Sequence, residues 1–450
     1  MPGRCCACMN PGARPDQAAG VDVGPVTAAP RFGIARVEVR GFRSVRAVSF
    51  APGQLCALVG EANAGKSNLL AAIRAVLDPA AAPLSPADAP EGGDGEVAIR
   101  VTLAGGGVAA LAGTPGRHAV TGPALPPVLF LPADARAGAV LADRSPQGQE
   151  VPPAVEIFRA ALAHDRRTST EQALSVIDAL ESCCARGLSG LLLLIEEPEL
   201  YLRPQAQRYL YRLLREFALA GNQVVYSTHS PAFLNVARLD ELVFVERRPQ
   251  TGTRALQPEP VGADEDFRVM TEFDAARSEL FLARAVVLVE GLTEKLVLPF
   301  VFSALGYDVD REAISIIECG GKPNIPLFAR ICRATGVPFV VVHDSDRKAS
   351  GRFAAAERAL NALIADTVGG EGTIVLDPDF EAVAGLVGHS RKPERAWREF
   401  ASRPSADMPE PLVRVAERAI SLSRAETMRR SAVPRSQGFL PNASSPRAPQ

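Results

Sequence analysis

The sequence has no long apolar run and no signal-peptide pattern. No apolar stretch approaches the roughly 20 residues that cross a bilayer, and the first residues, MPGRCCACMNPG, lack the apolar core of a secretory leader. We therefore expect a cytoplasmic protein without a membrane segment. The 450 residues are long enough for two or three domains.

The sequence also lacks an excess of charge and a recognisable zinc-binding pattern. Its 49 Lys and Arg residues nearly balance 51 Asp and Glu residues, so contact with nucleic acid would need a local basic surface. The eight cysteines fit a reducing compartment. Cys5, Cys6 and Cys8 have no second pair and no histidines at zinc spacing, which argues against a metal site there.

Lysine is the scarcest charged residue type. A chain that uses arginine almost everywhere is expected to keep lysine where a compact ammonium is needed, although chance placement is the alternative. The lysines are Lys66, Lys295, Lys322, Lys348 and Lys392.

The order of predicted elements indicates two α/β domains in succession. A polar stretch near residues 250–275 separates two series of apolar strands and helices. We expect a disordered N-terminus at 1–31, a first α/β domain at 32–265, a second at 275–400, and a tail at 401–450 that is helical and then disordered.

Residues 60–67, GEANAGKS, fit the phosphate-binding pattern GxxxxGK[ST] and stand between a predicted strand and a predicted helix. The glycines let backbone N–H groups close around phosphate oxygens, and the helix N-terminus adds its positive end. Lys66 is expected to reach the β- and γ-phosphates of ATP, and Ser67 to hold Mg²⁺. The expected nucleotide contacts of this loop are Gly60, Asn63, Gly65, Lys66, Ser67 and Asn68.

Two later strands carry the residues that complete a nucleotide site. The run LLLLIEEPE places Glu196 and Glu197 at the end of a hydrophobic strand. In P-loop proteins the first acid holds Mg²⁺, often through water, and the second polarises the attacking water. The next predicted strand ends in STHSP, where His229 is suited to contact the γ-phosphate.

Together FRSV, the GKSN loop, IEEPE with YLRP, and STHSP resemble the ABC-type ATPase heads of the RecF/SMC/Rad50-like class. The resemblance implies head dimers that trap ATP between one subunit's phosphate loop and the partner's signature motif. Residues 167–172, RTSTEQ, resemble a degraded signature without its usual glycines, and Ser169 would make the contact to the partner's nucleotide. The short segment between the two nucleotide motifs leaves no room for a long coiled coil.

The second domain raises a question of charge at FVVVHDSDRK, residues 339–348. Side chains two apart along a strand point the same way, so Asp344 and Asp346 are expected to converge at its C-terminal edge. Two carboxylates about 4 Å apart repel by about 4 kcal/mol at an effective dielectric near 20. The pair must therefore protonate, separate into water or share a cation.

The neighbouring motifs favour the cation. VLVEGLTEKLVLP, IIECGGKPNIPLF and VPFVVVHDSD, in this order, resemble the Toprim domain of the OLD family of ATP-dependent endonucleases. The resemblance implies an α/β fold: a P-loop ABC-type ATPase domain followed by a Rossmann-like Toprim domain that cuts DNA. The carboxylates expected to share Mg²⁺ or Mn²⁺ are Glu290, Glu294, Asp344, Asp346 and, less directly matched, Glu381.

The resemblance also gives the lysines and the whole chain expected roles. Lys392 is expected to steady the scissile phosphate, and Lys322 to meet a DNA phosphate. DNA is the expected partner, with DNA repair or phage defence as the setting and room for a separate partner protein. The alternative is an ATP-gated DNA clamp whose Toprim holds metal without cutting; a transporter ATPase or a topoisomerase fits less well.

Overall fold

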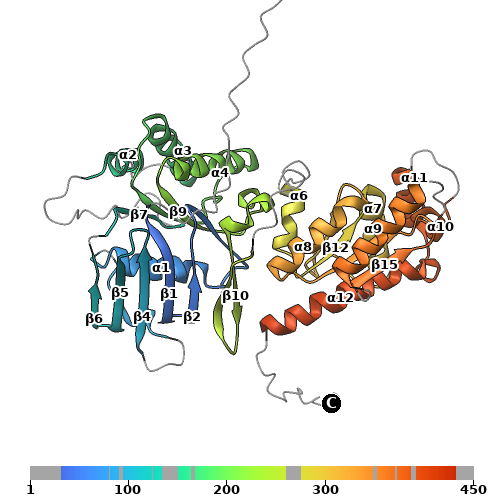
Figure 1. Ribbon diagram of the computed structural model, residues 1–450, viewed down its shortest axis with the longest axis horizontal. Coiled ribbons are helices and arrows are strands. Elements are labelled where there is room, and N and C mark those ends of the chain that lie inside the picture. Colours follow the sequence, from blue (N-terminus) through green and yellow to red (C-terminus); the bar gives the residue numbers. More distant parts are fainter. Residues whose placement is uncertain are drawn as a thin grey trace, which may run out of the picture.

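The computed structural model describes residues 32–80, 82–90, 95–123, 125–133, 151–163, 168–259, 275–347, 352–369, 372–386 and 392–431. The segments expected to be disordered, 1–31 and 432–450, lie outside these residues, as do the domain boundary near 265, Arg167 and Lys348. The described elements form two units, one from β1 to β11 and one from α6 (Ala275–Ser278) to α12 (Glu410–Ser431), which lie side by side in Figure 1.

An antiparallel sheet forms one layer of the first unit, with strand order β2-β1-β4-β5-β6. Its strands are β1 (Ile34–Phe42), β2 (Val45–Phe50), β4 (Val97–Leu103), β5 (Val108–Thr114) and β6 (Arg117–Thr121). Alternate apolar residues such as Val37, Val39 and Ile99 are buried in one core cluster with helix α1 (Lys66–Leu77). This alternation is the pattern of a sheet with one covered face.

The second sheet of this unit has the order β11-β10-β3-β9-β8-β7 and is parallel except for β11. Its strands are β3 (Leu55–Val59), β7 (Val128–Leu131), β8 (Leu192–Glu196), β9 (Gln223–Thr228), β10 (Leu242–Arg248) and β11 (Gly252–Leu256). Every residue of β3 and β9 is buried, because α1 covers one face and other helices cover the opposite face. Those helices are α2 (Pro153–Leu162), α3 (Ser169–Ala185) and α4 (Pro204–Leu219).

The second unit is a four-stranded parallel sheet with the order β13-β12-β14-β15. Its strands are β12 (Ala285–Val289), β13 (Ile314–Glu318), β14 (Phe339–Asp344) and β15 (Thr373–Leu376). Helices α8 (Ile325–Thr335) and α9 (Arg352–Val368) contribute to the core on one face, and α7 (Leu292–Ala304), α10 (Phe380–Ala384), α11 (Lys392–Ser402) and α12 to the core on the other. Because the strands are parallel, their C-terminal ends meet at one edge, where ligands bind in such sheets.

Helix α12 joins the second unit to the first. Leu412, Val415 and Ile420 are buried in the core of the second sheet, so the boundary predicted at residue 400 falls inside this packing unit. From there α12 runs back to β10, as Figure 1 shows. A continuous apolar cluster also crosses the junction, where the rings of Phe244 and Phe281 lie 5.5 Å apart.

Candidate functional site

The predicted phosphate loop joins β3 to α1, and packing requires both glycines of its pattern. A Cβ at Gly60 would collide with the carbonyl oxygen of Val245, and one at Gly65 would collide with the hydroxyl of Thr253. Gly65 also has a φ of 104°, a left-handed value that favours glycine. Close packing against β10 and β11 therefore accounts for both glycines of the pattern.

Lys66 lies inside this loop. The residue is 5% exposed, and its Nζ donates to the carbonyl oxygens of Gly60 (2.7 Å) and Glu61 (2.9 Å). Burial lowers the pKa of Lys66, while the nearby carboxylates of Glu197, Glu199 and Glu61 oppose that change. The Lys66 ammonium thus lies where phosphate oxygens are expected to bind. The side chains of Asn63 and Ser67 in the same loop are exposed.

Asn68, expected to contact the nucleotide, is engaged elsewhere. Its Nδ2 donates to Ser44 Oγ at 2.7 Å, and its Oδ1 accepts from Arg43 Nη1 at 3.2 Å. These bonds hold α1 to the FRSV turn between β1 and β2. The arrangement indicates that Asn68 orients this turn.

The acids after β8 meet the histidine after β9. Because β8 and β9 are adjacent and parallel, their ends lie together, and His229 Nδ1 is 3.4 Å from Glu197 Oε1. Glu197 has a φ of 43° and donates its N–H to Ser227 O at 3.0 Å. Glu196 accepts a longer bond from Ala133 N at 3.4 Å. The structure therefore brings Glu197 and His229 together, as expected.

Glu199 is a member of this group that the motif analysis missed. Its Oε1 accepts from Thr228 Oγ1 (2.8 Å) and His229 N (2.9 Å), and the residue is 5% exposed. The third acid of IEEPE was the available signal, since a buried carboxylate needs donors and STHS supplies them. Glu199 ties the histidine loop to the end of β8.

Ser169 is the first residue of α3 and is exposed. Thr168 and Glu171 form a capping box at this helix end, with Thr168 N donating to Glu171 Oε2 at 2.7 Å. The resembled signature thus begins an exposed, well-capped helix. Such a position suits a residue that contacts a second head.

The arginines of α4 divide between surface and interior. Arg203, the residue before α4, and Arg208 and Arg212 on the helix are exposed, and the Arg212 guanidinium lies over the Tyr209 ring. Arg215 turns inward, with its Nε 3.6 Å from Glu241 Oε1. The exposed basic row is therefore limited to the first three.

Glu61 connects the phosphate loop to the second unit. Its Oε1 lies 3.1 Å from Arg430 Nη1 at the end of α12 and 3.2 Å from Arg284 Nε, one residue before β12. Arg284 also donates to Thr427 Oγ1 at 3.0 Å, and Arg430 to Glu426 Oε1 at 2.7 Å. We call Glu61, Arg284 and Arg430 the loop clamp.

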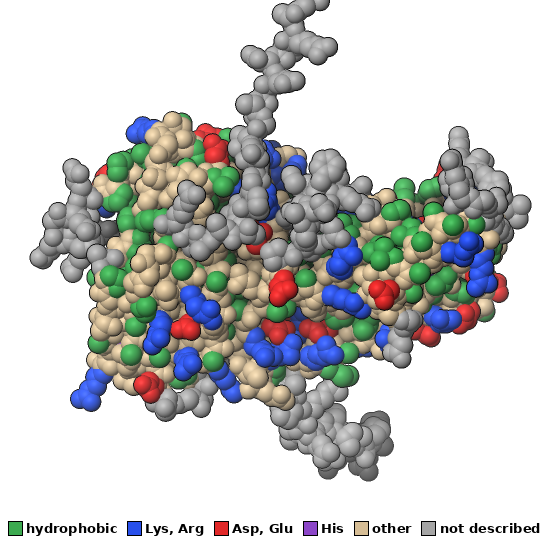
Figure 2. Space-filling view, viewed as in Figure 1, with side chains coloured by type: hydrophobic (Ala, Val, Ile, Leu, Met, Phe, Trp, Pro, Cys, Tyr) green, Lys and Arg blue, Asp and Glu red, His purple; other side chains and the backbone are tan. Residues whose placement is uncertain are grey.

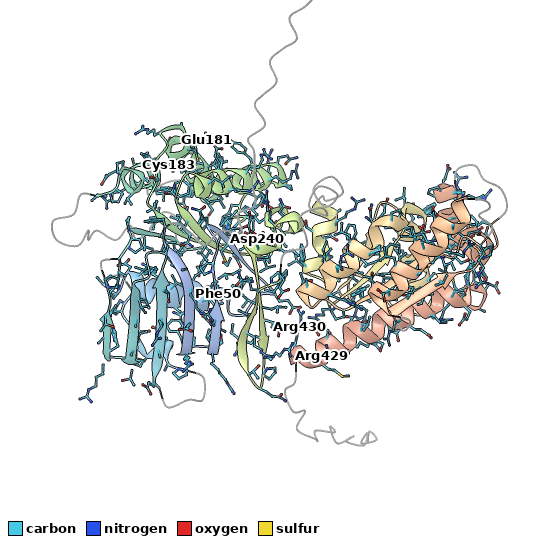
Figure 3. The ribbon with its side chains drawn as sticks, in the orientation of Figure 1. Phe50, Glu181, Cys183, Asp240, Arg429 and Arg430 are labelled. Atoms are coloured by element: carbon cyan, nitrogen blue, oxygen red, sulfur yellow. The ribbon has the colours of Figure 1, made fainter. Side chains whose placement is uncertain are left out.

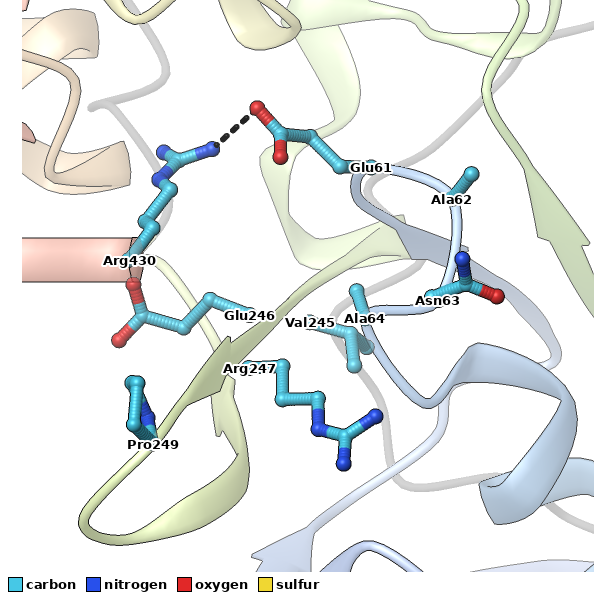
Figure 4. Close-up of a pocket in the computed structure, with 9 residues that line it drawn as sticks. All are labelled: Glu61, Ala62, Asn63, Ala64, Val245, Glu246, Arg247, Pro249 and Arg430. Atoms are coloured by element: carbon cyan, nitrogen blue, oxygen red, sulfur yellow. Dashed lines mark hydrogen bonds and ion pairs between the residues drawn. The ribbon is translucent and has the colours of Figure 1, made fainter. Parts of the chain in front are cut away.

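Glu61 and Arg430 of the loop clamp line a pocket of about 380 Å³ at the phosphate loop (Figure 4). Residues 61–64 line one side of the pocket, and β10 and Arg430 line the other. Figure 2 shows basic and acidic side chains side by side over this junction, and Figure 3 shows Arg429 and Arg430 at the α12 end facing β10. The second unit therefore touches the predicted phosphate loop directly.

The acidic group of the second unit lies at the C-terminal edge of its sheet. Glu290 follows β12, Asp344 ends β14, and Glu290 Oε1 accepts from Asp344 N at 2.7 Å. Glu294 lies in the first turn of α7 and is 8% exposed. These three carboxylates come from neighbouring elements, as the motifs predict.

Asp346 departs from the predicted geometry. Strand β14 ends at Asp344, and Asp346 has a left-handed φ of 51°, so strand alternation no longer sets its direction. Its Oδ2 accepts from Lys322 Nζ at 2.7 Å. A turn therefore places Asp346, not strand alternation, while its charge still raises the pKa of Asp344 through space.

Lys392 and Glu381 form a pair beside the same group. Lys392 Nζ lies 2.7 Å from Glu381 Oε1, and this hydrogen bond raises the pKa of Lys392. Glu381 raises the pKa of Asp344 and of Glu294 through space, which locates it near both. Lys392 and Glu381 thus belong to this edge of the sheet.

The acidic group has the electrostatics of a cation site. Burial raises the pKa of Glu290, Glu294 and Asp344 to about 7 each, and neighbouring carboxylates add to the rise. Asp344 Oδ1 is buried without a hydrogen-bond partner. Hard carboxylate oxygens fit Mg²⁺ or Mn²⁺, although within the described residues no three such side chains already form a metal-ligand set.

Mg²⁺ binding at this group is expected to strengthen as the pH rises from 6 to 8. The folded, metal-free carboxylates hold protons up to a pKa of about 7, and the ion must replace them, giving up to about tenfold per pH unit for each proton released. The free energy of unfolding of the metal-free protein depends on pH in the opposite direction. Between pH about 4 and 7 the folded state binds more protons than the unfolded state, so the free energy of unfolding falls as the pH rises.

Thermal melts at pH 6 and pH 8, with and without Mg²⁺ and without nucleotide, measure both effects. The same melts on Asp344→Asn provide the control, because that change removes one of the three groups. An equal Mg²⁺ response at the two pH values would contradict the prediction.

Comparisons with known proteins agree with this geometry. The pattern of the family described as "Overcoming lysogenization defect protein-like, TOPRIM domain" matches residues 281–346, an AAA-domain family matches 169–235, and a family of unknown function matches 33–85. The OLD nuclease of Thermus scotoductus is 37% identical over 212 residues, which are 43% of this chain and 40% of that protein. These matches support an OLD-family ATPase–Toprim protein. The Old nuclease of Escherichia phage P2 is 28% identical over 165 residues, 35% of this chain and 28% of that protein.

Solved structures are less similar to this chain. The SMC head domain from Thermotoga maritima has a TM-score of 0.34 at 14% identity and covers 50% of this chain and 99% of that one. The C-terminal region of the Xanthomonas campestris OLD protein has a TM-score of 0.26 at 14% identity and covers 33% and 98%. The family resemblance therefore rests on the sequence matches.

The fold is accordingly an α/β ATPase domain followed by a Toprim domain. The chain spans 40% and 28% of the lengths of its two OLD relatives. No helix among the described residues is both long and apolar enough to cross a membrane.

Proposed function

We propose that this chain is a member of the OLD family, that it binds and hydrolyses ATP, and that it cuts DNA in a reaction that requires Mg²⁺ or Mn²⁺. The observation that carries the proposal is the presence, on one chain, of a phosphate loop with its acids and of a separate buried acidic edge. The ATPase domain would span residues 32–265, and the nuclease domain would begin near 275 and include α12.

In the ATPase domain, the proposed nucleotide contacts come from the loop and the two strand ends. Lys66 would exchange its two carbonyl partners for phosphate oxygens, and Glu197 with His229 would orient the attacking water. Ser67 and Glu196 would hold Mg²⁺. Ser169 would act on the nucleotide of a second chain, which makes a homodimer of heads part of the proposal.

In the nuclease domain, Glu290, Glu294, Asp344 and Asp346 would hold divalent ions, with Glu381 at the margin. When bound, such ions stabilise charge on the phosphate and activate water. Lys392 would bind the scissile phosphate after leaving Glu381, from which it is 2.7 Å away. The exposed arginines of α4 offer a surface for DNA phosphates.

Cleavage of supercoiled plasmid tests the function. The wild type is expected to nick DNA with Mg²⁺ or Mn²⁺ and to be inactive with EDTA. The alternative function is an ATP-gated DNA clamp with a silent Toprim domain; it is favoured by the pairing of Asp346 with Lys322, which draws this carboxylate towards an ammonium. DNA binding that depends on ATP and Lys66, without cutting under any metal condition, would select the clamp.

The loop clamp supports control of the nuclease domain by the ATP site. Glu61 contacts Arg284, which immediately precedes β12, and β12 leads directly to Glu290. ATP binding changes the charge around residues 60–67, so it would act on Glu61 and its arginines. Two-site coupling of this kind is typically about 5- to 150-fold.

Glu61→Ala is expected to reduce the effect of ATP on the cleavage rate about fivefold or more, because both arginine contacts lose their acceptor. Cleavage rates with and without ATP, together with ATP affinity, measure the change. Glu246→Ala is the matched control, since Glu246 lines the same pocket but pairs with Arg248 within the head. An unchanged ATP effect in Glu61→Ala would exclude the loop clamp as the link.

A further inference from the structure

Lys322 is a buried, fully engaged cation at the nuclease site. Its side chain is 5% exposed. Its Nζ donates to Asp344 O (2.6 Å), Asp346 Oδ2 (2.7 Å) and Glu357 Oε2 (3.1 Å). A lysine ammonium has three hydrogens, so each has an acceptor. The structure thus engages Lys322 within the protein, and its expected contact with a DNA phosphate stays a prediction.

The backbone around Lys322 fixes the ammonium relative to the acidic group. Gly321, the residue before it, has a φ of 118° and donates its N–H to Glu290 O at 2.8 Å. Asn324 Nδ2 donates to Cys319 O at 3.0 Å and closes the same turn. The loop that carries Lys322 is therefore attached to the strand end that carries Glu290.

The backbone of Asp346 is fixed as well. Its N–H donates to Pro378 O at 2.9 Å, and the preceding Ser345 N donates to Leu376 O at 2.8 Å. The Asp346 carboxylate is 37% exposed and can turn about its own side-chain bonds. The Asp346 carboxylate can therefore bind either Lys322 or a cation shared with Glu290 and Asp344. It lies close to both of these acids, since its charge raises their pKa values.

We propose that Lys322 is the resident counter-ion of the nuclease site, which holds Asp346 when no divalent ion is bound and releases this carboxylate to the ion. The inference rests on the metal-dependent nuclease proposed above. A lysine suits the role because its ammonium is a compact point charge. Glu357 keeps Lys322 paired after Asp346 turns away, so the release leaves no buried charge alone.

The first test follows the Lys322 ammonium by ¹⁵N NMR during a Mg²⁺ titration of the wild type. The chain has five lysines, Lys66, Lys295, Lys322, Lys348 and Lys392, so the spectrum is simple, and Lys322→Met assigns the signal. We expect this signal to shift with the same midpoint as Mg²⁺ binding. A signal that stays in place while Mg²⁺ binds in an Asp344-dependent manner would overturn the proposal.

The second test measures Mn²⁺ affinity without nucleotide by titration calorimetry. Lys322→Met is expected to bind Mn²⁺ about tenfold more tightly or better, because a positive charge close to the ion is gone and Asp346 is free. Lys295→Met, a half-buried lysine at the same domain edge, is the control and is expected to match the wild type. Equal or weaker binding by Lys322→Met would identify a purely structural lysine and overturn the inference.

The two proposals fail in distinguishable ways. Absence of any Asp344-dependent Mn²⁺ binding by the wild type would overturn the metal-dependent nuclease, and the counter-ion with it. Metal-dependent cleavage with an unmoved Lys322 signal would overturn the counter-ion alone. If Lys322→Met does not fold, variants of the other four lysines assign the Lys322 signal by elimination, so the NMR test on the wild type still decides between the outcomes.

Discussion

Replacing Asp344 with asparagine is expected to lower the rate of metal-dependent DNA cleavage about 10³-fold. A bound metal ion contributes several kcal/mol of charge stabilisation in the transition state, and each 1.36 kcal/mol is about a factor of ten in rate. The asparagine side chain keeps the shape of the aspartate but removes its charge. Oδ1 of Asp344 is buried without a hydrogen-bond partner, which is unfavourable, and a bound cation would offset this cost.

Plasmid nicking and ATP affinity, measured on the same preparations, test this expectation. ATP affinity is expected to stay unchanged, because Asp344 lies at the Toprim edge and not at the phosphate loop. Asp366→Asn is the matched control, since it makes the same chemical change at an exposed position on α9. If Asp344→Asn nicked plasmid at the wild-type rate, the reaction would occur elsewhere on the protein or another nuclease would contaminate the preparation.

The sequence predicts the parts of both sites that depend on local order. A strand, a glycine turn and a helix around residues 60–67 require only neighbouring residues, and the loop lies between β3 and α1 as predicted. The same holds for Glu290 and Asp344, because each stands at the end of a buried parallel strand and such ends meet at one edge. Hydrophobic periodicity and the order of strands and helices are therefore enough to predict where the phosphate loop, Glu290 and Asp344 lie.

Contacts made by side chains after a strand has ended, or between residues far apart in the sequence, could not be predicted in this way. Alternation stops with β14, so it could not reveal that Asp346 turns to Lys322. Glu61 and Arg430 are 369 positions apart, and no local pattern links them. Their contact depends on α12 packing across the second sheet, which the sequence analysis assigned to a tail.

The structure also changes the interpretation of the scarce lysines. Lys66, Lys322 and Lys392 each hold backbone or carboxylate oxygens at 2.6–2.9 Å. Each of these ammonium groups thus has a partner within the protein at a place where a ligand is proposed to bind. The ligand is a phosphate for Lys66 and for Lys392. For Lys322 it is a metal ion, which would bind the partner carboxylate of Asp346. This supports the idea that lysine persists where a compact, exchangeable charge is needed.

Glu197→Gln is expected to lower ATP hydrolysis about 10²- to 10⁴-fold while ATP still binds. Positioned proton-transfer groups contribute this much to a rate, and the amide keeps the size of the side chain while losing its basicity. His229 loses its contact with the Glu197 carboxylate but keeps its backbone bond to Glu199, so the site is expected to stay folded. ATP would then persist at the head, and ATP-bound dimers would accumulate.

Phosphate release, ATP affinity and mass by light scattering with ATP measure these three effects on one variant. Lys66→Met is the contrasting variant, because loss of the ammonium is expected to remove ATP binding and therefore the dimer as well. Glu216→Gln, an exposed change on α4, controls for the loss of one charge. A Glu197→Gln protein that hydrolyses ATP at the wild-type rate would exclude Glu197 as the base. A protein that traps ATP yet stays monomeric would mean that Ser169 does not serve a second head.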